Sequence, residues 1–528
     1  MHPHPDPHRP PAPEAASDTA PDTAPDAAPD AGADTLPRGV ATAPLVHWQE
    51  GGADQRAHWL SPAGAPAPRR LAVADDTLKA DTALRWISEG TALVWRGDFQ
   101  NARHLLQALG RRIDEKAARA AARAPQGAGP ADAQARRRGS RGPAAAAAVA
   151  DAVASAAVRP GEDLPGHADA EARASASADT LATATAGAGA DAPAGDPRAL
   201  AFHRHRQAQA HRARILGGVL VPLAPGWQVP LRRAPDVQAA CEEVMGPWPT
   251  PAARLAQPAR SGQPAQLPHT AHPSHPSPSP DEPPPLALIS LRELQGLVGA
   301  HEWRKKGVPI PALGASVHPH HGVFSPVRGE YIDLVARAPL PAALAAHPLA
   351  VDVGTGTGVL AAVLARRGVP RIIATDQDPR ALACAADNLQ RLGLAAAVEL
   401  QRADLFPAPV SRGCGLVVCN PPWVPARPAS PIEAAVYDPD SRMLRGFLGG
   451  VAAHLAPDGE AWLILSDLAE HLGLRRREDL LGWIEAGGLQ VRGRLEARPR
   501  HPKATDRSDP LHAARMAERT SLWRLGRR

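Results

Sequence analysis

An acidic, glycine-rich turn in the C-terminal third of the chain could bind a nucleoside. The range 351–360 reads V-D-V-G-T-G-T-G-V-L. Its apolar start predicts a strand, and the good helix formers from Ala361 onward predict a helix. Glycines at every second position let the backbone pass close to a ligand, and the first turn of the helix directs free N–H groups toward it. The candidate binding residues in this turn are Asp352, Gly354, Thr355, Gly356 and Gly358.

A second acid follows at the spacing of a β-α-β unit. The apolar range 371–375 predicts the next strand, which ends at Asp376, 24 positions after Asp352. An acid at that point can accept hydrogen bonds from both hydroxyl groups of a ribose. With the adjoining Gln377, it predicts a cradle for a nucleoside cofactor. A turn without a ligand is the structural alternative, because tight turns and close helix packing also require glycine.

The glycine spacing separates two kinds of nucleoside cofactor. A dinucleotide-binding turn has the pattern G-x-G-x-x-G, and its third glycine would fall at Val359. The pattern found, D-x-G-x-G-x-G, resembles motif I of class I S-adenosylmethionine-dependent methyltransferases. The resemblance implies S-adenosyl-L-methionine as the cofactor and an α/β fold with a Rossmann-like, seven-stranded sheet at the C-terminus. An NAD-dependent oxidoreductase fits poorly, because the sequence also offers no obvious hydride-transfer residues.

A proline-rich tetrapeptide follows the fourth predicted strand, counted from the glycine-rich turn. The apolar range 415–419 leads into Asn420, Pro421, Pro422 and Trp423. These four residues resemble the [D/N]-P-P-[Y/F/W] motif of methyltransferases that act on planar amino nitrogens. A turn that merely ends a strand is the structural alternative.

The resemblance implies a chemical role for each residue of the tetrapeptide. The lone pair of an amide or exocyclic NH₂ group is delocalised, so the nitrogen attacks a methyl sulfonium poorly. The side-chain oxygen of Asn420 and the carbonyl of Pro421 can each accept one N–H bond, which returns electron density to the nitrogen. The prolines stiffen the turn, and Trp423 offers a flat face on which a base or an amide can stack.

Further stretches extend the resemblance on both sides of the tetrapeptide. In the methyltransferase pattern, an acid at Asp404 accepts the adenine amino group of the cofactor, and Leu405 packs on the ring. The range 324–331 is similar to the segment before motif I in HemK (PrmC)-like methyltransferases of the "small-domain" type. It implies that Arg328 and Glu330 line the cofactor entrance on the substrate side. The range 433–439 resembles the passage after their tetrapeptide.

The substrate of such an enzyme stays open between two macromolecular classes. A nucleobase amine of RNA or DNA fits the tetrapeptide and the basic residues in the range 498–507. A glutamine side-chain amide in a protein fits the HemK-like flanks. A non-catalytic binding protein that keeps the cofactor fold as a scaffold is the alternative. The joint presence of Asp376, Asp404 and Asn420 argues against that alternative.

Composition restricts where hydrophobic cores can form. Only 3% of the 528 residues are aromatic, and the chain contains 59 prolines. All 18 aromatic residues lie outside the ranges 1–47, 100–201 and 249–302. Large apolar side chains supply most of the buried area of a core, so the positions of the aromatic residues indicate where cores can form. The formal charge of +5 is compatible with a nucleic-acid partner but does not require one.

These composition shifts predict seven segments. A capping box of Ser290 and Glu293 marks the start of the lead-in helix. We expect a smaller, mainly helical N-terminal domain that is interrupted by a long insertion. The segments are 1–45, a disordered tail; 46–115, the first part of the N-terminal domain; 116–197, a low-complexity insertion; 198–246, the second part; 247–284, a Pro/Ser/His-rich linker; 285–345, a lead-in helix and active-site loop; and 346–528, the methyltransferase domain.

The remaining signals argue against a metal, a membrane and an oxidising compartment. His318, His320 and His321 lack helical ligand spacing and a nearby acid or cysteine, so we predict no metal site. The cysteines show no paired spacing and predict buried, reduced thiols. No apolar run approaches 18 residues and the start has no signal-peptide core, which predicts a cytoplasmic protein with no membrane partner.

Overall fold

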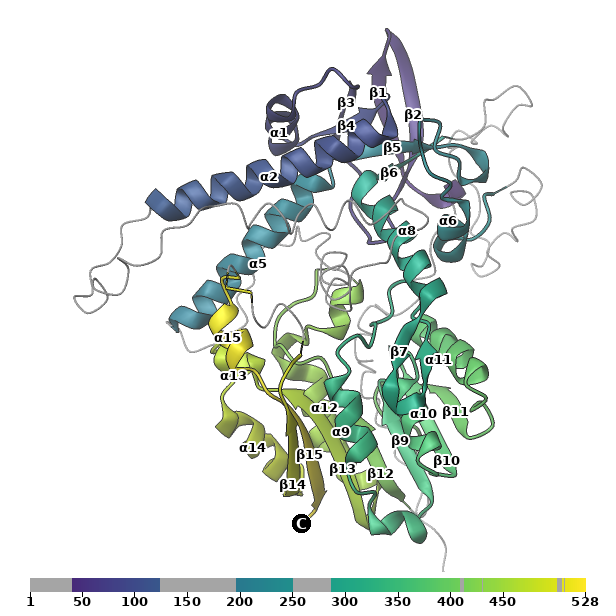
Figure 1. Cartoon of the computed structure of the whole chain (residues 1–528), viewed down its shortest axis with the longest axis vertical. Coiled ribbons are helices and arrows are strands. Elements are labelled where there is room, and N and C mark those ends of the chain that lie inside the picture. Colours follow the sequence, from purple (N-terminus) through teal and green to yellow (C-terminus); the bar gives the residue numbers. More distant parts are fainter. Residues whose placement is uncertain are drawn as a thin grey trace, which may run out of the picture. The chain divides into compact units, whose positions relative to one another are not determined.

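Two β-sheets organise the protein (Figure 1). The computed structural model describes residues 40–123, 196–249, 286–408, 413–429, 431–500, 506–507 and 509–528. Six strands form the N-terminal sheet and seven form the C-terminal sheet, while β7 (Val308–Ile310) and β8 (Ala315–Val317) pair between them in the sequence. Most of the expected tail, insertion and Pro/Ser/His-rich linker lie outside the described residues.

The C-terminal sheet has the strand order β11-β10-β9-β12-β13-β15-β14. Its strands are β9 (Leu349–Val353), β10 (Arg371–Asp376), β11 (Val398–Arg402), β12 (Cys414–Cys419), β13 (Leu455–Ser466), β14 (Leu489–Ala497) and β15 (Thr520–Arg527). The first five are parallel, and β15 runs antiparallel to both β13 and β14. This sheet confirms the predicted Rossmann-like fold with seven strands.

Helices connect the strands of this sheet. They are α9 (Glu330–Arg337), α10 (Val359–Arg366), α11 (Pro379–Arg391), α12 (Arg442–His454), α13 (Leu468–His471), α14 (Arg477–Ala486) and α15 (His512–Ala517). Every residue of β9 and β12 is buried, as expected for central strands of a parallel sheet with both faces covered. The apolar face of α10 and that of α9 join the core on one side, and α12 and α14 join it on the other.

The strand order reverses between β9 and β12. From β9 the chain proceeds outward through β10 to β11, and it then returns to place β12 on the other side of β9. In open α/β sheets, ligands bind beyond the carboxyl ends of the strands at such a point. The glycine-rich turn follows β9 and the tetrapeptide follows β12, so the fold brings both sequence motifs to this position.

The N-terminal part is a mixed α/β unit and not the mainly helical domain expected from the sequence. Its sheet has the order β1-β2-β6-β5-β4-β3. Its strands are β1 (Leu45–Glu50), β2 (Ala53–Leu60), β3 (Arg70–Ala74), β4 (Thr91–Trp95), β5 (Val219–Leu223) and β6 (Ala287–Ser290). The apolar run 219–221 predicts β5, and the sequence does not indicate the other five strands. The others are short or carry polar residues on an exposed face, as in β2. Their alternation of apolar and polar residues is therefore too weak to distinguish a strand from a helix.

Five helices accompany this sheet. They are α1 (Ala80–Ser88), α2 (Phe99–Arg123), α5 (Pro197–Leu216), α6 (Gln238–Met245) and α8 (Leu291–Lys306). Asp98 accepts a hydrogen bond from the Gln100 N–H at 2.8 Å and so caps α2, as its place before the helical spacing of Ala102, Leu105 and Leu109 predicts. The helix continues past residue 115, where we expected the insertion to begin, because its alanines and alternating charges sustain a helix without a core contact.

The lead-in segment 285–345 is divided between the two sheets. Strand β6 pairs with β2 and β5 of the N-terminal sheet. Leu291, Leu294 and Leu297 in the first half of α8 belong to the N-terminal core, whereas Trp303 in the second half packs on the C-terminal core. Figure 1 shows α8 leading from β6 to β7. We therefore propose a domain boundary within α8 in place of one before residue 285.

The predicted capping box at the start of α8 does not form. Ser290 makes no side-chain capping bond. Glu293 instead accepts hydrogen bonds from the Ser61 hydroxyl at 2.9 Å and, more weakly, from the Ala63 N–H at 3.5 Å. Tertiary contact with the end of β2 therefore replaces the local interaction that the sequence favoured.

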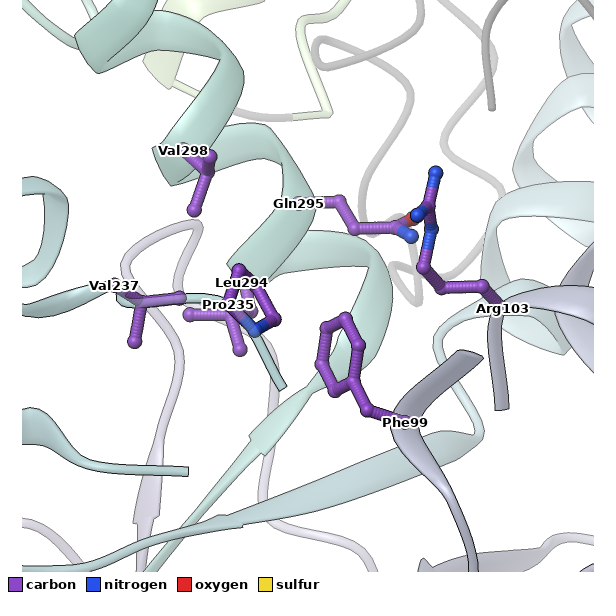
Figure 2. A pocket seen from close by; sticks show the side chains of 7 residues that line it. All are labelled: Phe99, Arg103, Pro235, Val237, Leu294, Gln295 and Val298. Carbon is purple, nitrogen blue, oxygen red and sulfur yellow. The ribbon is translucent and has the colours of Figure 1, made fainter. Parts of the chain in front are cut away.

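A small apolar hollow lies in the N-terminal part, between α2, α8 and the segment before α6 (Figure 2). Arg103 and Gln295 supply its polar side chains, and the other lining residues are Phe99, Pro235, Val237, Leu294 and Val298. None of these residues was predicted as a site residue. The four cysteines are buried and unbonded, which confirms the predicted thiols. No helix within the described ranges is long and apolar enough to cross a membrane.

Glu293 gives the N-terminal core a pH-dependent stability. Burial raises the pKa of its carboxyl to about 7, whereas an unfolded glutamate titrates near 4.3. The folded state therefore loses stability as the pH rises from about 4.3 through 7, because it resists ionisation of this group. We expect Glu293→Gln to gain stability relative to the wild type by on the order of 3 kcal/mol between pH 4 and pH 8.

Urea unfolding at several pH values measures this difference. Glu302→Gln, at an exposed glutamate on the same helix, is the matched control and should follow the wild type. An equal pH dependence in wild type and Glu293→Gln would contradict the assignment.

Candidate active site

The predicted site residues gather at the carboxyl ends of three neighbouring strands. Val353 of β9 pairs with Thr375 of β10 on one side and with Cys419 of β12 on the other. The residues that follow these three are Gly354, Asp376 and Asn420. Strand register alone therefore brings the glycine-rich turn, the ribose acid and the tetrapeptide to the same edge of the sheet.

The glycine-rich turn needs glycine for its backbone shape. Gly354, Gly356 and Gly358 all have positive φ, at 71°, 54° and 79°. A Cβ on Gly354 would lie 2.8 Å from the Cε atom of Met443, whereas the space beside Gly356 is open. The N–H groups of Gly354 and Thr355 both donate to the Thr375 carbonyl, at 2.9 and 2.8 Å. The turn is thus tied to β10 and leaves an open cradle at Gly356.

Asp352 organises this turn from within. Its carboxylate is buried and accepts hydrogen bonds from the Thr355 hydroxyl at 2.7 Å and from the Ala361 N–H at 3.1 Å. Burial raises the pKa of Asp352 to about 6. Its Oδ1 atom has no hydrogen-bond partner among the described residues. The acid therefore links the turn to the first turn of α10 and retains one unused acceptor.

Asp376 stands at the end of β10 beside the turn. It accepts hydrogen bonds from the Gly356 N–H at 3.1 Å and from the Asp378 N–H at 2.9 Å. Burial raises the pKa of its carboxyl. Gln377 is exposed, and its carbonyl accepts a bond from the Arg402 side chain. Asp376 is thus oriented by the same glycine that opens the cradle.

Asp404 and Leu405 lie at the next strand end, after β11. The Asp404 side chain is exposed and forms an ion pair with Arg442 at 3.1 Å. Leu405 has a positive φ of 72°, which is rare for a branched residue and is held by a 2.6 Å bond from the Thr375 hydroxyl to its carbonyl. Its side chain packs so closely on α12 that a Cβ on Gly446 would lie 2.8 Å from it. These contacts hold Leu405 in its strained backbone conformation at the edge of the site.

The tetrapeptide closes on itself. The indole N–H of Trp423 donates a 2.9 Å hydrogen bond to the side-chain oxygen of Asn420. Trp423 is partly buried and touches core clusters on both faces of the C-terminal sheet. The acceptor that the sequence assigned to a substrate amino group is therefore satisfied by the motif's own tryptophan.

Two of the three neighbouring histidines, His318 and His320, contact protein groups. His318 Nδ1 lies 2.7 Å from the Arg304 carbonyl, and His320 Nε2 lies 3.0 Å from a carboxylate oxygen of Asp387. Among the residues that the structure describes, no group of three or more His, Cys, Asp or Glu side chains could hold a metal ion. These histidines lock the β8–α9 loop to α8 and α11.

Comparisons with known proteins agree with this geometry. The family model of the methyltransferase small domain matches residues 314–476. The release factor glutamine methyltransferase of Cereibacter sphaeroides is 35% identical over 158 residues, which cover 27% of this chain and 54% of that protein. That of Mycobacterium tuberculosis is 32% identical over 203 residues, covering 35% and 58%.

These matches locate a methyltransferase small domain at residues 314–476. A ribosomal protein L11 methyltransferase of Rhodopseudomonas palustris is also 32% identical over 168 residues, which cover 31% of this chain and 48% of that protein. The chain spans about half the length of the curated relatives it matches. Among solved structures, the ribosomal protein L11 methylase of Lactobacillus delbrueckii is similar at 16% identity, with 39% of this chain and 81% of that one covered. Its TM-score of 0.27 is too low to support an argument about function.

A buried charge cluster supports the tetrapeptide of the methyltransferase domain. The Arg328 guanidinium lies 4.9 Å from the centre of the Trp423 ring. It donates to Glu330 at 2.8 Å and to Glu518 at 3.0 Å, and both carboxylates are buried. The Ser466 hydroxyl donates to Glu518 at 2.6 Å. The structure therefore places Arg328 against the face of Trp423, and Glu330 reaches the tetrapeptide only through Arg328.

Sequence reasoning missed part of this cluster. Glu518 precedes β15 and Ser466 ends β13, so their proximity to Trp423 depends on the antiparallel pairing of these two strands. Arg442, the partner of Asp404, likewise comes from the start of α12. No short motif marks these residues, and only the sheet topology could have identified them.

We predict that removing Arg328 destabilises the methyltransferase domain. Arg328→Met leaves the buried Glu330 and Glu518 without this cation, and breaking a buried pair by removing one partner costs about 3–5 kcal/mol. Urea unfolding measures the loss. Adding Glu330→Gln and Glu518→Gln to Arg328→Met removes the orphaned charges and should recover most of the stability. A loss below about 1 kcal/mol in the single variant would show that the cluster is not electrostatically coupled.

Proposed function

We propose that this protein is an S-adenosyl-L-methionine-dependent methyltransferase that modifies a planar amino nitrogen of a macromolecule. The observation that carries the proposal is the register at the switch point of the sheet. It sets Asp376, Gly354 and Asn420 side by side on adjacent strands. A cofactor held by the first two would present its reactive group to an amino group held by the third.

The residues present fit the cofactor. Gly356 offers an open cradle, and Asp376 carries a carboxylate that can accept from both ribose hydroxyls. At the end of β11, Asp404 would accept the adenine amino group and Leu405 would pack on the ring. The side chains of Asp352, Thr355 and Gln377 would maintain the turn and its rim. When bound, the cofactor supplies a methyl group on a positively charged sulfur.

The amino group would be held by the tetrapeptide. The Asn420 oxygen and the Pro421 carbonyl can accept its two N–H bonds and return electron density to the nitrogen. The Trp423 indole now satisfies the Asn420 oxygen, so a substrate would exchange one hydrogen bond for another. Pro422 limits how far the turn can open. Trp423, released from Asn420, would keep its ring against Arg328 and present a face to the planar group.

A glutamine side-chain amide in a protein is the substrate class we favour. Release factor glutamine methyltransferases are among the relatives that this chain matches, at 35% and 32% identity. A nucleobase amine is the second candidate, because the loop after β14 carries Arg498 and Arg500. A non-catalytic binding protein is less consistent with a complete set of acceptors at the strand ends.

A labelling experiment tests the activity and separates the two substrate classes. The full-length protein is incubated with cell extract and S-adenosyl-L-methionine that carries a labelled methyl group. We expect label in macromolecular material that protease digestion releases and ribonuclease does not. Ribonuclease-sensitive label would favour the nucleobase, and label in neither fraction would contradict the proposed activity.

Asp376→Ala should weaken cofactor binding at least tenfold. The variant removes hydrogen bonds to a charged acceptor, each of which contributes about 1.5–3 kcal/mol. Isothermal calorimetry with S-adenosyl-L-methionine measures the affinity, and thermal unfolding checks that the fold survives. Glu399→Ala, on the exposed edge strand β11, is the control. Unchanged affinity in Asp376→Ala would remove the ribose assignment.

Asn420→Ala should lower the rate of methyl transfer by about 10²–10³ and leave cofactor affinity nearly unchanged. It removes one preorganised acceptor from the reacting amino group. Trp423→Phe should retain much of the activity, because it keeps the flat face and frees the Asn420 oxygen. Trp423→Ala should weaken substrate binding by roughly 1–3 kcal/mol if a planar group stacks there.

Stability measurements beside the kinetics distinguish function from packing. If Trp423 only filled the core, Trp423→Ala would lower the stability by about 3–5 kcal/mol, and the loss of activity would track unfolding. Full transfer by a folded Asn420→Ala would argue against methylation of an amino nitrogen.

A further inference from the structure

Helix α5 of the N-terminal part contacts the segment that follows the tetrapeptide. Its Arg206 forms two hydrogen bonds with the Glu433 carboxylate, at 3.1 and 3.0 Å. The same guanidinium donates to the Arg427 carbonyl at 3.0 Å and lies 4.0 Å from the centre of the Tyr437 ring. One side chain from α5 therefore holds three points between residues 427 and 437.

Glu433 is the centre of this segment. Its side chain is 2% exposed, and it also accepts a hydrogen bond from the Ala429 N–H at 2.6 Å. Its carbonyl accepts from the N–H groups of Val436 and Tyr437, at 2.9 and 2.8 Å. A buried carboxylate requires a compensating charge, and Arg206 supplies one in a two-bond geometry that suits arginine better than lysine.

The segment held by Arg206 is continuous with the tetrapeptide. Val424 directly follows Trp423, and it bridges to Tyr437 across the segment. Phe202, one helical turn before Arg206, packs in a cluster with Val424, Leu472 and Leu511. Trp423 and Tyr437 border the same cluster. Phe202 thus contacts Val424, the residue after Trp423, and Arg206 contacts Tyr437, which bridges to Val424.

The contact has two physical interpretations with different consequences. In the first, α5 only covers a buried surface, and its loss would lower stability without a specific effect on the site. In the second, α5 fixes the direction in which the chain leaves Trp423. The position of the Asn420–Trp423 turn relative to Gly354 would then depend on it. The second is favoured because Arg206 binds backbone and side-chain groups of one short segment and not a broad apolar face.

We infer that α5 completes the methyl-transfer site, with Arg206 as a positioning residue that acts through Glu433 on the tetrapeptide. This inference rests on the proposed function and assigns the N-terminal part a role in it. The described residues 424–429 and 431–438 become the substrate-side wall of the site, and their order depends on a helix more than 200 residues earlier in the sequence. The contacts of Arg206 named above all lie in the chain that follows β12.

Full-length Arg206→Ala tests the inference with two independent readouts. Hydrogen exchange should become faster at the amides of Val424, Val436 and Asp438, which are bonded within the segment. The rate of label transfer from S-adenosyl-L-methionine to macromolecules of a cell extract should fall, by roughly 10²-fold if the turn shifts by about 1 Å. The affinity for S-adenosyl-L-methionine should stay within about twofold. Loss of one hydrogen bond to the cofactor would weaken binding about tenfold or more, and this variant removes none of the proposed cofactor contacts.

Companion variants keep the test decisive. Arg204→Ala, at an exposed position on the same helix, should match the wild type in both readouts. Arg206→Lys, which keeps the charge but not the paired bonds, should recover only part of the transfer rate. Glu433→Gln, which neutralises the buried carboxylate, should remain folded and show the same exchange and transfer defects if Arg206→Ala fails to fold.

The outcomes distinguish this inference from the proposed function. Absence of transfer by the wild type would contradict the proposed function. Hydrogen exchange in the segment that is slower in the wild type than in Arg206→Ala would not change that conclusion. An active wild type together with an equally active, folded Arg206→Ala or Glu433→Gln would overturn the inference. Loss of transfer that only tracks thermal unfolding in every variant would overturn it as well.

Discussion

The candidate site depends on the parallel register of three strands. Because β10, β9 and β12 pair without a bulge over Ile372–Thr375, Ala350–Val353 and Leu416–Cys419, their carboxyl ends finish at one level. A shift of one residue in β12 would turn Asn420 to the other face of the sheet. Every residue of β9 and β12 is buried, so such a shift would move each side chain of β12 into a space shaped for another. The close packing of the core therefore resists the shift.

The two sides of the candidate site stabilise their carboxylates in different ways. Toward the cofactor position, Asp376 and Asp352 are oriented by backbone N–H groups and a hydroxyl, and no cation is paired with either among the described contacts. Toward the substrate position, Arg328 lies between two buried glutamates and the Trp423 ring. A positively charged cofactor favours the first environment, whereas the second holds a flat ring in a fixed orientation.

Much of the C-terminal sheet could be predicted from the sequence, because its strands are apolar runs that end in recognisable turns. Gly354, Asp376 and Asn420 were found in this way, since each follows such a run. The N-terminal sheet was missed because β1 and β2 alternate with exposed polar residues, and β6 follows a proline-rich segment that indicated a linker. Glu293 was assigned to a local cap, but its tertiary contact with Ser61 prevailed. Glu518 and Arg206 could not be found, because their roles depend on pairings across 190 and 227 positions.

The N-terminal part reaches the methyltransferase domain through two different kinds of contact. Through α8 the connection is covalent, and Arg304 of that helix pairs with Glu243 of α6 at 2.9 Å and with Asp387 of α11 at 2.8 Å. Through α5 it is made by Arg206 on the segment after Trp423. The first contact touches the helix that follows Asp376, and the second touches the chain that follows Asn420. A displacement of the N-terminal part would therefore move α11 and the chain after Trp423 together. It would change the distance between the proposed cofactor and substrate positions on the two sides of the switch point.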